Sequence, residues 1–206
     1  MKPLEKLISI ASGALNQVHG EDSFSGKLGE ELLSVLRLKS GFYAFEGALH
    51  FFPGAKTDHD ASISEWNADS LWRHEYAGLA DGLLFFAEDA FGNQFCIQGD
   101  SILSFDAETA QTEPFAENFE EWAEKILGDY PVLTGHPLLR EWQLKNGGLP
   151  LGMRLIPKIP FVLGGDYKLD NLFKISAVSG MRTRGNLARQ FKDLPDGAQV
   201  SYKVVE

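Results

Sequence analysis

Residues 83–97 read LLFFAEDAFGNQFCI and carry the clearest structural signal in the chain. Two apolar runs flank the acidic pair Glu88–Asp89 and the pair Gly92–Asn93. Gly and Asn best tolerate the positive φ of a tight turn, so the pattern predicts two antiparallel strands joined at Gly92–Asn93. The two carboxylates then lie at the end of the first strand, where burial stops. We interpret them as turn residues rather than catalytic acids.

Apolar runs separated by short turn segments continue on both sides of this hairpin. Residues 82–115 hold three apolar runs separated by short segments rich in Gly, Asn, Asp or Ser, which is typical of an antiparallel meander. Upstream, residues 41–55 are rich in aromatics around Glu46–Gly47 and predict a strand, a tight turn and a second strand.

Helical periodicity dominates elsewhere. Apolar residues at helical spacing predict an N-terminal helix pair over residues 3–20 and 27–41. Residues 56–67 are polar and are expected to form a loop. Asn67 is expected to cap a short helix over residues 68–79, with Leu71, Trp72 and Tyr76 facing inward.

An acidic amphipathic helix follows the meander. Its apolar positions are Phe119, Trp122, Ala123 and Ile126, and it is expected to end near Gly128 and Pro131. The opposite face carries Glu117, Glu120, Glu121 and Glu124. This face is either a solvated surface or a docking surface for a basic partner, and these four residues are the candidate partner-binding set.

The remaining chain is rich in Pro and Gly. A brief helix is expected near residues 138–144, a second over residues 176–191, and a closing turn and strand over residues 194–205. The expected fold is α+β, with a mostly antiparallel sheet, the N-terminal helix pair and further flanking helices. Residues 1–130 form the core, and residues 131–206 form a C-terminal α/β extension packed on it.

Composition limits the class of protein. Of 206 residues, 44% are hydrophobic and 12% aromatic, which is enough for a packed core. No apolar run approaches the ~20 residues of a membrane span, and Glu5 and Lys6 interrupt the start of the chain, so we expect a cytoplasmic protein without membrane contact. Cys96 is the only cysteine, which excludes an intramolecular disulfide and a cysteine-based zinc site.

Charge argues against nucleic-acid binding and is unevenly distributed. The formal net charge is −10, whereas affinity for nucleic acid comes mainly from cations. Residues 1–150 carry 10 Lys or Arg against 24 Asp or Glu, and residues 151–206 carry 9 against 5. This asymmetry indicates either two surfaces with different partners or, as we favour, an acidic body on which a basic segment docks.

No motif for catalysis, metal binding or cofactor binding stands out. Residues 25–30 (SGKLGE) lack the upstream Gly and following Ser/Thr of a phosphate-binding loop. Cys96 is expected to pack between apolar neighbours. Asp58, His59 and Asp60 are adjacent residues whose side chains diverge, so they do not suggest a metal site. Four cations near the end of the last predicted helix could bind an anion, but cations are expected at a helix C-terminus in any case; they are Arg182, Arg184, Arg189 and Lys192. We therefore expect no catalytic residue, no cofactor and no metal.

The order of these elements resembles the SUKH superfamily of Smi/Knr-type proteins. The likeness rests on residues 41–53, residues 65–67 with Trp72, and three further stretches, which are residues 83–97, 102–109 (ILSFDAET) and 119–127 (FEEWAEKIL). The resemblance implies an antiparallel sheet flanked by helices. Many bacterial members are immunity proteins that neutralise toxins by binding them, and fungal relatives regulate cell-wall synthesis through partners. This chain departs from compact members by continuing for 79 residues after Leu127.

The resemblance leads us to expect a non-enzymatic protein-binding module of the immunity type, whose acidic body suits a basic toxin domain. Two alternatives stay open. One is a small-molecule-binding protein with a pocket between Trp66, Trp72 and residues 157–165. The other is a regulatory adaptor.

Overall fold

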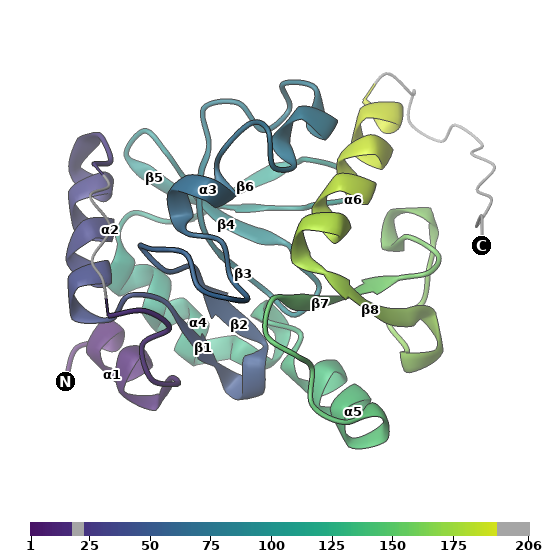
Figure 1. Ribbon diagram of the computed structural model, residues 1–206, viewed down its shortest axis with the longest axis horizontal. Helices are drawn as coiled ribbons and strands as arrows, with labels where there is room; N and C mark the ends of the chain where they lie inside the picture. The colour runs from purple at the N-terminus through teal and green to yellow at the C-terminus, as the bar shows by residue number, and fades with distance from the viewer. Residues whose placement is uncertain (18–22, 193–206) are drawn as a thin grey trace.

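The hairpin at Gly92 lies in the middle of a six-stranded sheet. The computed structural model describes residues 1–17 and 23–192. Its strands follow one another in chain order, each antiparallel to its neighbours (Figure 1). They are β1 (Phe42–Ala44), β2 (Leu49–Phe51), β3 (Leu84–Glu88), β4 (Gln94–Gln98), β5 (Ser101–Phe105) and β6 (Thr112–Ala116). The α+β class, the meander and the turn around Glu46–Gly47 are confirmed; that turn is the 3-10 helix η1 (Phe45–Gly47).

Strand β6 was not predicted, because Glu113 and Pro114 interrupt its alternation. Among residues 1–17 and 23–192 it pairs only with β5 and forms one edge of the sheet. A proline cannot donate to a strand ladder, and an edge position makes this tolerable.

Helix α4 (Phe119–Leu133) covers one face of the sheet, as its apolar spacing predicted. The Trp122 ring contacts the rings of Phe51, Phe86 and Phe95 at centroid distances of 6.0, 5.4 and 5.8 Å. Helical geometry breaks at Asp129 (φ −144°), near the expected end, and then resumes through Leu133. The ring of Pro131 clashes with the preceding helical turn, which accounts for the kink.

The other face is covered by aromatic residues and by α6 (Ala177–Phe191). Trp72 packs against Phe85, and Tyr76 packs against Phe105. A Cβ on Gly185 of α6 would lie 2.6 Å from Tyr76 Cδ2. The glycine that weakens this helix therefore allows its close approach to the core.

One of the two N-terminal helix predictions was partly wrong. Helix α2 (Gly26–Leu38) forms as predicted, but α1 (Pro3–Ile10) ends early. The backbone after α1 instead donates hydrogen bonds to the segment that leads into β1: Ser12 N to Tyr43 O and Asn16 N to Ser40 O. These contacts with a distant segment replace the last turns of the predicted helix. Residues 18–20 of that prediction lie outside the described residues.

The segment before β3 also differs from its prediction. The expected loop contains α3 (Ile63–Trp66), which is capped by Ser62, whose Oγ accepts a hydrogen bond from Glu65 N at 3.1 Å. Asn67 ends this helix instead of starting the next one. Its side chain bonds to both backbone groups of Phe85, and only the short 3-10 helix η2 (Arg73–Tyr76) follows. Trp72 and Tyr76 are buried as expected.

The C-terminal segment begins with α5 (His136–Asn146), which covers the predicted brief helix. A two-stranded sheet, β7 (Met153–Pro157) and β8 (Leu172–Ser176), precedes α6; its link contains the 3-10 turns η3 (Phe161–Leu163) and η4 (Leu169–Asn171). Figure 1 shows α6, β7 and β8 on the side of the molecule opposite α1 and α2. The predicted strand over residues 194–205 lies outside the described residues. In the part of the chain that the structure describes, no helix is both long and apolar enough to cross a bilayer.

Candidate functional site

The acidic face of α4 forms beside its buried stripe, because the two sets of residues alternate at helical spacing. Glu120, Glu121 and Glu124 lie on α4, but the prediction that Glu117 shares this helix was wrong, because Glu117 precedes the N-cap residue Asn118. Glu117 and Glu124 are exposed. Glu120 is partly engaged, since its Oε2 accepts a hydrogen bond from Leu4 N at 3.1 Å. Glu121 lies 2.8 Å from Lys125 Nζ, whose hydrogen bond lowers the pKa of the Glu121 carboxyl. Two of the four candidate residues therefore already have partners within the chain.

The predicted turn between β3 and β4 is confirmed, with Gly92 at φ +77°. The expectation that burial stops at Glu88 and Asp89 was wrong, because Glu88 is 0% exposed and Asp89 is 8% exposed. Asp89 Oδ1 accepts hydrogen bonds from the backbone N–H groups of Phe91 and Asn93, both at 2.8 Å. Asp89 Oδ2 accepts from Asn93 Nδ2 at 3.0 Å. Asp89 therefore holds the turn in shape.

Burial raises the pKa of Asp89 from 3.8 to about 6, against the lowering effect of these hydrogen bonds. The folded state therefore holds the proton more tightly than the unfolded chain, and this contribution to stability is lost as the pH rises from about 4 to about 6. The difference of about two pH units corresponds to at most about 3 kcal/mol. We expect Asp89→Asn to lose this part of the pH dependence, because an amide does not titrate in this range.

Denaturant unfolding at pH 4.5, 5.5 and 7 measures this effect. The control is Asp106→Asn, because exposed Asp106 also caps a turn through the N–H groups of Glu108 and Thr109. Loss of the same pH dependence in the Asp106→Asn control would show that the effect does not come from the buried carboxyl of Asp89. Equal changes for wild type and Asp89→Asn would contradict the expectation.

A cluster of buried polar side chains surrounds Glu88. His50 of β2 pairs across the sheet with Glu88, and its Nδ1 lies 3.0 Å from Glu88 Oε1. Arg154 of β7 places its Nε 2.9 Å from the same oxygen, as an ion pair without good hydrogen-bond alignment. Burial alone would raise the pKa of Glu88, but the Arg154 charge and the His50 hydrogen bond together lower it. Glu88 is therefore ionised and ties the sheet to the C-terminal segment.

The cluster extends to the loop before α3. Tyr43 Oη donates to Asp60 Oδ1 at 2.5 Å, and the Tyr43 ring stacks on His50 with centroids 4.2 Å apart. Burial lowers the pKa of His50, so the imidazole is neutral, and its Nε2 lies 3.6 Å from Asp60 Oδ1. The Arg154 guanidinium covers the Tyr43 ring. This cluster is enclosed, which indicates a role in stability.

Sequence reasoning missed this cluster. A histidine inside the apolar run ALHFF (48–52) and an arginine inside MRLIP (153–157) were the available signals. A lone polar residue in a buried strand requires a buried partner. Nothing in the sequence indicates that these two residues share Glu88.

The other candidates have structural contacts. Cys96 is 0% exposed, and burial raises the pKa of its thiol to about 12, which fits a packing role. Arg184 is buried and donates to Phe91 O at 2.5 Å, and Arg182 donates to Leu71 O at 2.7 Å. Asp58 and His59 are exposed, and residues 1–17 and 23–192 contain no His, Cys, Asp or Glu group that could hold a metal ion.

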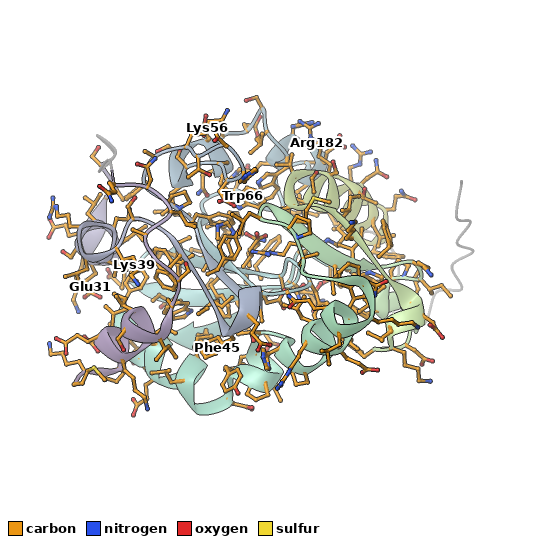
Figure 2. The ribbon with its side chains drawn as sticks, turned by 60° about the horizontal axis from the view of Figure 1, so that its bottom comes forward. Glu31, Lys39, Phe45, Lys56, Trp66 and Arg182 are labelled. Carbon is orange, nitrogen blue, oxygen red and sulfur yellow. The ribbon has the colours of Figure 1, made fainter. Side chains whose placement is uncertain are left out.

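The pocket expected between Trp66, Trp72 and residues 157–165 does not form. Both rings are buried in the core, where Trp66 stacks on Phe52 and contacts Trp72. Figure 2 shows Trp66 in the interior, with Lys56 and Arg182 toward the periphery. The two tryptophans serve as core residues rather than as a ligand cage.

An open hollow of about 390 Å³ lies on the same face of the sheet as α4, toward the β6 edge. Its lining includes side chains from β4, β5, β6 and the end of α4. Among the lining residues are Asp89, Phe95, Asp106, Glu113, Phe115 and Leu133. Lys125 joins this hollow to the acidic face of α4, because its Nζ lies 2.8 Å from Glu121 Oε1 and donates to the backbone oxygen of Phe115, a residue of the lining.

The fold and these contacts define a class: an α+β domain with an antiparallel meander, a covering acidic helix and an enclosed polar cluster. Residues 20–125 match the SMI1 / KNR4 family (SUKH-1), and the chain belongs to that family. Members of this family are known as immunity proteins and related regulators, and they are generally non-enzymatic. The expected SUKH membership is confirmed.

A solved structure supports the fold. The crystal structure of Atu4351 from Agrobacterium tumefaciens is similar with a TM-score of 0.50, covering 76% of this chain and 75% of that one. The sequence identity is 16%, so the likeness concerns the fold alone. No curated protein matches the chain.

Proposed function

We propose that this protein is a non-enzymatic immunity protein that neutralises a toxin by binding it. Its membership of the SUKH-1 family over residues 20–125 is the observation that carries the proposal. The net charge of −10 supports a basic toxin domain as the partner, because opposite charges raise association rates and disfavour wrong partners. The cytoplasm is the location that we propose for this encounter.

The acidic face of α4 is the proposed contact surface, with Glu120, Glu121 and Glu124 of the helix and Glu117 just before it as its residues. Glu117 and Glu124 are its main contributors, since Glu120 and Glu121 have partners within the chain. Residues 1–130 serve as the recognition core, and residues 131–206 as an extension that stabilises it. The Arg154–Glu88 ion pair supports that division of roles.

Co-expression with the toxin gene encoded beside this one tests the proposal. The wild-type chain is expected to restore growth and to co-elute with the toxin in gel filtration. The variant Glu117→Lys/Glu124→Lys is expected to weaken the complex at least tenfold, mainly through slower association and most strongly at low salt. Both side chains are exposed, so the fold is expected to persist.

The control is Asp58→Lys combined with Asp69→Lys, which reverses two exposed charges in the segment between β2 and β3. It is expected to leave the affinity within about threefold of the wild type, since charges more than a Debye length away (~8 Å in physiological salt) are largely screened. If the wild-type chain neither restores growth nor forms a complex, the immunity role is lost. A complex without restored growth indicates a regulatory adaptor instead.

A further inference from the structure

The hollow beside β6 is a part of the sheet face that α4 leaves uncovered. Phe95 and Ser104 pair across β4 and β5, and Ser104 pairs with Glu113 of β6, so their side chains share one face. Trp122 of α4 covers the Phe95 side of this row. Toward Glu113 the row lines the hollow, and Leu133 at the end of α4 also belongs to the lining.

The charged side chains that line this hollow are all acidic. Asp89, Asp106 and Glu113 line it, and no Lys, Arg or His belongs to its lining in the described part of the chain. Asp106 and Glu113 are exposed. Asp89 is fixed by three hydrogen bonds, so its position does not depend on a partner. Three carboxylates around one depression favour the approach of a cation.

The wall of the hollow adds an aromatic surface. The Phe95 and Phe115 rings contact each other with centroids 5.0 Å apart. The chain's own Lys125 places its Nζ 5.8 Å from the Phe115 ring centroid, so this ring already interacts with one ammonium group. Cations are attracted to aromatic faces, and long cationic side chains bury their aliphatic stems against them.

We propose that this hollow is the docking site for an arginine- or lysine-bearing segment of a basic protein partner. The cationic head lies between Asp106 and Glu113, and its stem lies against Phe115. This inference rests on the proposed function, since it assigns the hollow to the same basic partner. The hollow adjoins the acidic face of α4, because Lys125 contacts both Glu121 and the backbone oxygen of Phe115.

A titration of the full chain with a blocked Gly-Arg-Lys-Arg-Gly peptide, followed by 15N–1H NMR, tests the site without the toxin. Amide shifts are expected to concentrate at residues 104–106 and 113–115. Glu113→Lys is expected to weaken binding at least fivefold, because it reverses a charge that lines the hollow. The variant is expected to fold, because Glu113 is exposed on the edge strand β6. Phe115→Leu, which removes the ring but keeps apolar bulk, is expected to weaken it about threefold.

Two controls distinguish binding of the peptide in the hollow from non-specific attraction to the acidic protein. Glu30→Lys makes the same change of charge on α2 and is expected to alter the affinity less than twofold. The matched peptide Gly-Glu-Gln-Glu-Gly is expected not to bind. Equal weakening by Glu113→Lys and Glu30→Lys, or shifts that map elsewhere, overturns the proposed site.

The neutralisation assay distinguishes this inference from the proposed function. If wild type and Glu113→Lys bind and neutralise the toxin equally, the hollow is not the docking site, although the immunity role stands. If the wild type does not neutralise the toxin but the peptide binds in the hollow, the immunity role fails and the site for a basic segment stands.

Discussion

Replacing Arg154 with methionine is expected to lower the free energy of unfolding by about 3–5 kcal/mol. Glu88 is 0% exposed, and Arg154 is its only cationic contact within 4 Å among the described residues. Neutral His50 and Gln94 would remain as hydrogen-bond partners of Glu88. They do not balance a full charge in the interior, so the variant leaves an uncompensated carboxylate in the core.

Chemical denaturation of four proteins measures this effect: wild type, Arg154→Met, Glu88→Gln and the double variant. The double variant is expected to recover at least half of the loss, because it removes both charges and keeps the amide acceptor for His50. The control is Arg140→Met, because Arg140 is 61% exposed and its Nε forms a loose ion pair with Glu46 Oε2 at 3.9 Å. The control is expected to cost less than about 1 kcal/mol. A loss below 1 kcal/mol for Arg154→Met would show that Glu88 takes up a proton or water instead.

Trp122→Ala is also expected to cost about 3–5 kcal/mol, because it removes the largest apolar side chain between α4 and the sheet. Trp122 is 0% exposed and contacts four phenylalanine rings; these belong to Phe51, Phe86, Phe95 and Phe119. Removing the indole leaves a cavity between these rings and α4, the helix that carries the acidic face. The variant is therefore expected to weaken toxin binding as well, by loosening α4.

Thermal and denaturant unfolding test this expectation with two companion variants. Trp122→Phe is expected to cost much less than Trp122→Ala, because it keeps a ring and removes the indole N–H, which has no hydrogen-bond partner in the described part of the chain. Val132→Ala, also in α4 but 74% exposed, is expected to have little effect. A Trp122→Ala protein with wild-type stability would mean that α4 is not held by this contact.

The elements with strong local signals were predictable. Gly92 has the positive φ that its turn requires, and the apolar spacing of Phe119 and Trp122 gave the covering helix and its acidic face. These features depend on neighbours within a few residues. The candidate glutamates followed from the same periodicity, and their role as a contact surface stays a prediction.

The elements decided by distant contacts were not predictable. Helix α1 ends early because the following backbone bonds to residues near β1. Asn67 ends a helix because its side chain bonds to Phe85, 18 residues away. The hollow depends on where α4 stops relative to β6, and that position has no signature in either segment.

The meander of β3, β4 and β5, the hairpin at Gly92 and the amphipathic character of α4 were determined by the sequence alone, because residue periodicity and turn chemistry act over short distances. The burial of Glu88 was decided only by the tertiary structure. A carboxylate after an apolar strand is expected at the surface unless a cation reaches it, and that cation is Arg154, 66 positions further along the chain. The cost of burying a carboxylate and its compensation by a cation depend on the distance between the two groups in the folded protein, and the local sequence pattern contains no information about that distance.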